Sequence, residues 1–182
     1  MAELTWNEKI DRFYEQEFDE SDPEGSIARM VALISERPTD DAAAFFELGG
    51  VHDALGLEPE AIRRYRQAIE AGLEGERAIR VHIQLASTLR NVGSSAEAVS
   101  ILESMPPAGD DDAARQAFLA LALHDQGRFG DALRTALLAL IPTLDGYKRS
   151  LTAYAEELPV GRSSHNEKGQ DRAMFPSAPV VS

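Results

Sequence analysis

Histidines and clustered carboxylates are the side chains in this sequence that could do chemistry, as metal ligands or as general acids and bases. The histidines are His52, His82, His124 and His165. No two of them have the spacing of an H-x3-H or HExxH zinc site. The sequence has no cysteine, which excludes thiolate metal ligands and cysteine nucleophiles. The three consecutive carboxylates at 110–112 are expected to cap a helix. We therefore expect no metal site.

Motifs for nucleotide binding and for a nucleophilic serine are also missing from the sequence. Its turn glycines lie between predicted helices, whereas a phosphate-binding glycine loop joins a strand to a helix. No serine lies in a G-x-S-x-G pattern. The sequence predicts neither an enzyme nor a cofactor.

One polar set of side chains does have a spacing that favours binding, because three- and four-residue steps bring side chains to one face of a helix. Its members are Arg80, Gln84, Ser87, Arg90 and Asn91. An arginine can hold a carboxylate with two parallel hydrogen bonds, and an amide can bond to an extended backbone. The alternative for Arg90 is a structural salt bridge with Asp53 or Asp125. Both interpretations stay open at this point.

A recurring pattern of glycine and alanine determines the elements that carry these residues. Gly56, Gly93 and Gly127 each lie five residues before an alanine, at intervals of about 37 and 34 residues. Such spacing is typical of stacked pairs of helices, each of which needs its neighbours to bury its apolar face. Three pairs are predicted at about 42–75, 79–109 and 113–141, which together form a unit over 42–141.

The helix pairs resemble the tetratricopeptide repeat. The first pair has Phe45-x2-Leu48-Gly49-x2-His52 before its turn and Ala61-x3-Tyr65-x2-Ala68 after it, and the other two pairs keep the small residues. The resemblance implies an all-α, right-handed superhelical stack of antiparallel helix pairs. Residues 83–93 and 147–151 look more narrowly like a group of small stand-alone bacterial tetratricopeptide proteins of unknown function.

In the resembled family, the first helix of each pair lines a concave groove. The polar set of the second pair would lie there, flanked by Phe46 of the first pair and by Phe118 and His124 of the third. We therefore expect a non-enzymatic module that binds a protein or peptide, such as an acidic or C-terminal segment. His52 and His82 occupy motif positions of aromatic residues and are expected to pack in the core.

The alternative function is a self-associating scaffold, which would be a homodimer built through apolar helix faces. Two surfaces are candidates for it: the apolar face of the third pair and an N-terminal aromatic stripe, Trp6, Phe13 and Phe18. A monomer or a weak homodimer is expected.

The segments outside the repeats are predicted from helical stripes and from prolines. Residues 1–41 form a degenerate leading helix pair with an acidic start, and residues 142–159 form a capping helix. In the cap, Leu144, Tyr147, Leu151, Tyr154 and Leu158 make the apolar stripe. Residues 160–182 are expected to be a flexible tail.

Composition and charge limit the partners. The 182 residues are 43% hydrophobic and carry a formal net charge of −13, which disfavours nucleic acid and anionic membrane surfaces. No apolar run approaches the ~18 residues of a membrane span. The N-terminus lacks the basic and apolar regions of a signal peptide, so a cytoplasmic protein is expected.

Overall fold

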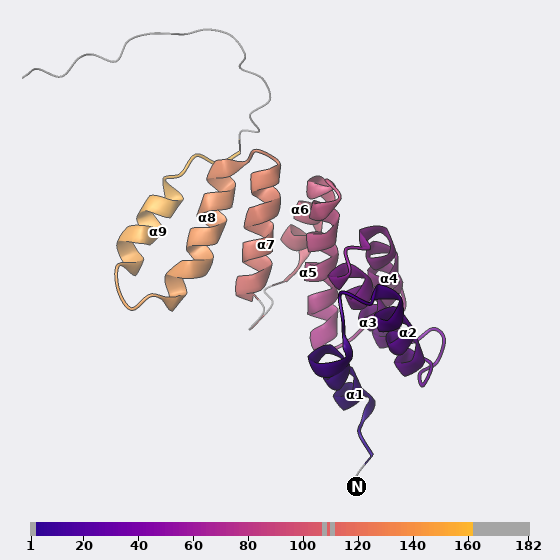
Figure 1. Ribbon diagram of the computed structural model, residues 1–182. Coiled ribbons are helices and arrows are strands. Elements are labelled where there is room, and N and C mark those ends of the chain that lie inside the picture. Colours follow the sequence, from indigo (N-terminus) through magenta and orange to yellow (C-terminus); the bar gives the residue numbers. More distant parts are fainter. Residues whose placement is uncertain (1–2, 107–108, 110–111, 162–182) are drawn as a thin grey trace, which may run out of the picture.

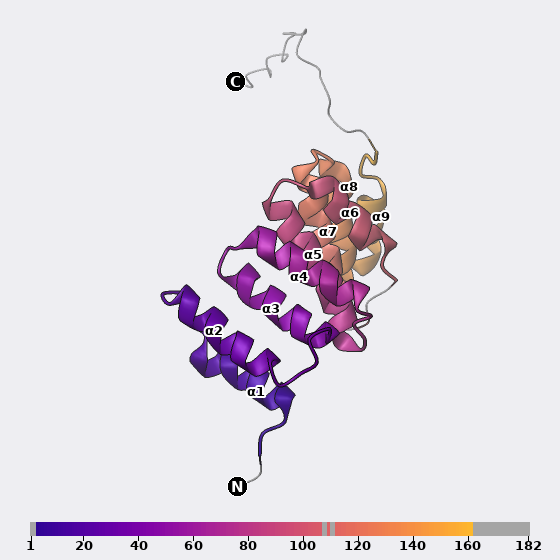
Figure 2. The ribbon, with the colours of Figure 1, turned by 90° about the vertical axis from the view of Figure 1, so that its right-hand side faces the viewer.

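The computed structural model describes residues 3–106, 109 and 112–161, and these residues form helices and turns without a strand. Consecutive helices pack side by side as antiparallel pairs along the stack (Figures 1 and 2). The all-α stack predicted from the repeats is confirmed. The α-helices are α1 Trp6–Arg12, α2 Pro23–Ile34, α3 Ala42–Ala54, α4 Glu58–Glu70, α5 Glu76–Asn91, α6 Ser95–Ser104, α7 Asp112–Asp125, α8 Phe129–Leu140 and α9 Lys148–Glu156.

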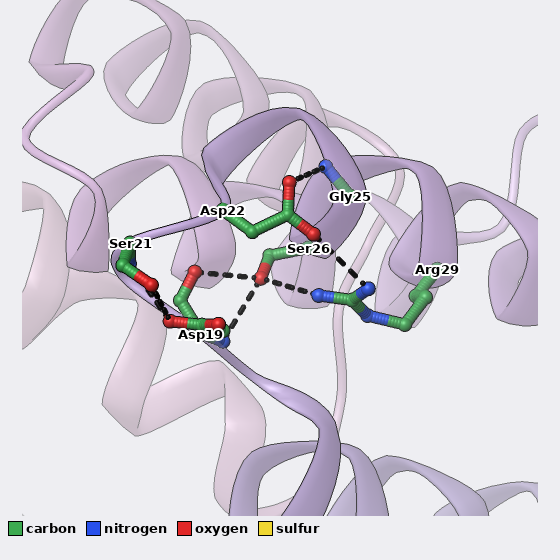
Figure 3. Close-up of polar contacts among 6 residues, drawn as sticks. All are labelled: Asp19, Ser21, Asp22, Gly25, Ser26 and Arg29. Carbon is green, nitrogen blue, oxygen red and sulfur yellow. Dashed lines mark hydrogen bonds and ion pairs between the residues drawn. The ribbon is translucent and has the colours of Figure 1, made fainter.

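The two helices of the leading pair, α1 and α2, both have a side-chain cap at their N-terminus. Thr5 and Glu8 form a reciprocal capping box at the start of α1, which continues into a π-helical turn at Phe13–Glu17. Asp22 caps α2 through the backbone N–H of Gly25, at 3.0 Å. The buried hydroxyl of Ser26 donates to the carbonyl of Asp19, so the loop between the helices is fixed as well (Figure 3).

The three regular pairs share one core. It is built from small residues that let helices approach, such as Ala61, Ala68 and Ala98, and from larger ones such as Tyr65 and Leu102 that fill the spaces between them. Gly49 shows how close the approach is, because a Cβ built there would lie 2.6 Å from the Tyr65 ring.

The turn glycines have the backbone conformation that favours glycine. Gly56, Gly93 and Gly127 adopt φ values of 67°, 81° and 73°. A residue with a Cβ is strained in this left-handed region. The repeat spacing therefore reflects a backbone requirement at each turn.

The C-terminal helix differs from its predicted form. A 3-10 turn at Ile141–Thr143 follows α8, and α9 begins only at Lys148. Tyr147 is 86% exposed and Tyr154 is also exposed, so the predicted stripe is wrong at both tyrosines. Ala155 is the residue of α9 that is buried, because a small side chain allows the helix to lie close to its neighbours.

Several expectations concern residues that lie outside the described part of the chain. They are the capping role of Asp110 and Asp111, the position of His165 and the flexible tail beyond Gly161. Within the described ranges, none of the helices is both long and apolar enough to cross a membrane.

Candidate functional site

Two adjoining cavities form a groove between α1, α3 and α5. The first has a volume of about 570 Å³ and the second about 410 Å³. Tyr14, Gly50 and Gln84 line both cavities, so the groove is continuous across the leading pair and the first two repeats. The remaining residues of the first cavity are Asn7, Ile10, Asp11, Phe46, Glu47, Glu74, Gly75, Glu76, Arg77 and Arg80. Those of the second cavity are Asp53, Ala54, Tyr65, Ser87 and Asn91.

Most of the polar set predicted on the second repeat lies in this groove. Arg80 lines the first cavity, Ser87 and Asn91 line the second, and Gln84 lies between them. The Oε1 atom of Gln84 is buried and has no hydrogen-bond partner among the described residues. A buried acceptor without a hydrogen-bond partner is unfavourable.

Phe46 belongs to the core as much as to the groove. It is buried and packs against Tyr65, with ring centroids 6.1 Å apart. The motif assigned core packing to Phe45 and left Phe46 for a ligand, yet Phe46 is the more buried of the two. It therefore forms part of the groove floor.

Arg90 lines neither cavity and forms an ion pair with a residue of the third repeat. Its Nε contacts the Oδ2 of Asp125 on α7, so of the two interpretations the structure contains the salt bridge. Asp53, the other suggested partner, instead accepts hydrogen bonds from Thr88 Oγ1 at 2.9 Å and Tyr65 at 3.3 Å. Burial raises the pKa of the Asp53 carboxyl, and these two hydrogen bonds oppose that rise.

The third repeat contributes nothing to this groove. Phe118 is half-buried against the main core. His124 is exposed and lies edge-on to Phe129, with ring centroids 5.0 Å apart, in a separate apolar groove on α7 and α8. Seven of the eight candidate residues thus divide among the polar groove between α1, α3 and α5, the core and a second surface, and the eighth, Arg90, pairs with Asp125.

The ion pair between Arg77 and the buried Glu47, at one end of the groove, was not predicted from the sequence. Arg77 Nε donates to Glu47 Oε1 at 2.7 Å, and its Nη2 donates to Asn7 Oδ1 at 3.2 Å. The guanidinium also lies 5.6 Å from the ring centroid of Trp6, which adds a cation–π contact. Burial raises the pKa of the Glu47 carboxyl, and Arg77 opposes that rise.

The groove wall formed by the leading pair was also missed. Asn7, Asp11 and Tyr14 follow one another in steps of four and three on α1 and its π-helical extension, so they share one face. This polar stripe is visible in the sequence and could have indicated that the leading pair contributes to the groove. Ile10 lies beside this stripe and also lines the first cavity, and Ile10 and Phe13 both pack in the core of the leading pair.

The charges of the first cavity are predominantly negative. Arg77 pairs with Glu47, and Arg80 lies 3.7 Å from the carboxylate of its neighbour Glu76. Two further carboxylates, Asp11 and Glu74, line the same cavity. The groove thus offers hydrogen bonds and an excess of negative charge. Within the described part of the chain, no cluster of three or more metal-ligating side chains is present.

Comparison with known proteins agrees with this architecture. No curated protein matches the chain. A family model described as "Tetratrico peptide repeat" matches residues 42–158, which extend from the start of α3 to two residues beyond α9. The match covers well over half of the chain, and the chain belongs to the tetratricopeptide repeat family.

Proposed function

We propose that the groove between α1, α3 and α5 binds an extended peptide segment of a partner protein, without catalysis. Tetratricopeptide repeats are in general protein-interaction modules and non-catalytic scaffolds. The observation that carries the specific proposal is the continuous groove, with Gln84 at the junction of its two cavities.

The polar side chains of α5 suit a peptide backbone. Gln84, Ser87 and Asn91 line the groove over seven residues of helix, which rise about 10 Å. An extended chain covers that distance with about three residues. Amide and hydroxyl side chains both donate and accept hydrogen bonds, so they can pair with backbone N–H and C=O groups of such a segment.

The charges favour a basic segment over an acidic one. The expectation of an acidic or C-terminal partner depended largely on Arg90, whose guanidinium contacts Asp125 instead. Asp11 and Glu74 would attract a lysine or arginine of the bound segment, and Glu76 adds to the same field. We therefore propose a segment that places a cationic side chain in the first cavity.

Selection of random peptides on the full-length chain, followed by affinity measurements, tests the proposal. A double variant, Asp11→Lys with Glu74→Lys, should weaken the selected peptides by about tenfold, or about 1.4 kcal/mol. Glu60→Lys is the matched control, because Glu60 is exposed on α4 and does not line the groove.

Two results would count against the proposal. Equal losses in the double variant and in Glu60→Lys would exclude the groove as the binding site. If the selected peptides were acidic and bound more tightly to the double variant, the groove would still be the binding site. The proposal that the partner segment is basic would then be wrong.

Self-association through the N-terminal aromatic stripe is disfavoured. Phe13 is fully buried, and Trp6 and Phe18 pack against the same core cluster, so this stripe is the interior of the leading pair. The apolar face of the third repeat is exposed and remains available for an interaction.

A further inference from the structure

A second groove, on the third repeat, is almost entirely apolar. It has a volume of about 500 Å³ and lies between α7 and α8. Leu121, Phe129 and Leu133 are large side chains that line it, and all three are exposed. Contiguous exposed apolar surface of this kind usually marks a binding site.

The repeat geometry explains why this face is uncovered. Val99 of the second repeat is 5% exposed, whereas Leu133, at the equivalent position 34 residues later, is 50% exposed. Leu102 is buried in the same way, whereas the equivalent Ala136 is exposed. In the second repeat the next helix of the stack, α7, packs on both α5 and α6. After the third repeat, α9 packs mainly on α8 and the 3-10 turn, so the position of a next first helix stays open.

The described chain ends at the rim of this groove. The carbonyl of Pro159 lies against the backbone of Gly130, in the first turn of α8, where a Cβ would overlap it. Phe129, the neighbour of Gly130, lines the groove. The last described residues of the chain therefore lie beside the apolar surface.

The sequence that follows has two parts. Residues 162–172 are polar and contain five charged side chains. Residues 173–182 contain no charged side chain, although 27% of the whole chain is charged, and they include Met174, Phe175 and Val180. Eleven extended residues, 162–172, span up to about 36 Å. The 12 residues of α8 span about 18 Å, so the apolar part can reach the whole groove.

We propose that residues 173–182 dock within the same chain on the apolar groove of α7 and α8, at the position of the absent next helix. Phe175 and Met174 supply the apolar side chains that cover Leu121, Phe129 and Leu133. The short connection gives an effective concentration in the millimolar range for flexible linkers, so a weak contact suffices. This surface is separate from the polar groove and independent of the function proposed for it.

Paramagnetic broadening in NMR spectra of the full-length chain tests the docking. The chain has no cysteine, so a nitroxide on Ser177→Cys labels one site. Docking predicts loss of the amide signals of Leu121, Leu133 and Ala136, with the signals of Gln84 and its neighbours retained. Leu133→Asp should restore the lost signals, whereas Leu140→Asp, an equally exposed leucine of α8 outside the groove, should not.

A mixed sample separates docking within one chain from docking on a second copy. It contains isotope-labelled chains without the nitroxide and unlabelled chains that carry it. Retained signals in the mixture, together with losses in the singly labelled chain, support the proposal. Equal losses in the mixture would assign the groove to a second copy, and the absence of losses in both samples would exclude the segment as its occupant; either result overturns the proposal.

Discussion

Replacement of Arg77 by alanine tests whether the polar groove is held together by a buried ion pair. Arg77 lies on α5 and contacts Glu47 on α3 and Trp6 on α1, so one side chain connects three helices. The Glu47 side chain is 6% exposed and that of Arg77 is 27% exposed. The variant would leave a buried carboxylate without its cation.

The loss of stability expected for Arg77→Ala follows from the burial of the Glu47 carboxylate. Removal of one partner of a buried ion pair costs about 3–5 kcal/mol of unfolding free energy. Because water reaches part of Arg77, we expect the lower end, about 3 kcal/mol. In a protein of this size that loss lowers Tm by about 6–12 °C. Arg66→Ala is the matched control, because Arg66 and Glu97 form an ion pair of the same length in which both side chains are about half exposed. It should cost less than about 1 kcal/mol.

Thermal unfolding followed by circular dichroism measures both variants. The fluorescence of Trp6, the one tryptophan of the chain, reports on the end of the groove at the same time. In the double variant Arg77→Ala with Glu47→Gln, part of the stability should return, because a neutral amide is less costly to bury than a carboxylate. Equal melting temperatures for Arg77→Ala and Arg66→Ala would refute the reasoning.

Burial raises the pKa of Glu47, so the folded chain binds this proton more tightly than the unfolded chain. As the pH rises from 4.5 through the folded-state pKa, the wild type should lose stability relative to Glu47→Gln in urea unfolding, and a constant difference would contradict this. Gly49→Ala should destabilise the fold by about 1–3 kcal/mol, since its Cβ would crowd the Tyr65 ring; an unchanged Tm would mean that the ring yields freely. Arg90→Ala should cost about 1 kcal/mol or less through loss of the Asp125 pair and leave the affinity of groove-selected peptides unchanged, whereas a large loss of affinity would make Arg90 a binding residue.

The repeat architecture was predictable because it depends on local features of the chain. Gly56, Gly93 and Gly127 have positive φ values that favour glycine, and small residues are needed wherever two helices approach closely. These requirements recur in each pair and leave a period in the sequence. The helical spacing of Gln84, Ser87 and Asn91 indicated that they share one face, and all three line the groove. Their role in binding stays a prediction.

Which side of each helix is buried and which is free was less predictable from the sequence. The helix α3 packs against the leading pair on one side and against α4 and α5 on the other, so Phe46, Glu47 and His52 are all buried. A helix that is covered on several sides loses the one-sided pattern from which a free face is inferred. In α9 the three- and four-residue spacing indicated a helix, but not that Ala155 would be buried and Tyr154 exposed.

Contacts between distant segments left no signal in the sequence. Asn7 and Arg77 are 70 residues apart, and their hydrogen bond closes one end of the groove. The contribution of α1 to the groove follows from how the leading pair stacks on the first repeat. A search of the sequence for local spacing cannot detect that arrangement.

A footprint of a bound peptide tests the central claim most directly. Hydrogen exchange or amide chemical shifts of the full-length chain would be recorded with and without a peptide selected on it. We predict changes at Gly50, Gln84, Ser87 and Asn91, which line the groove on α3 and α5. Changes confined to α7 and α8, with the residues of α3 and α5 unaffected, would contradict the account.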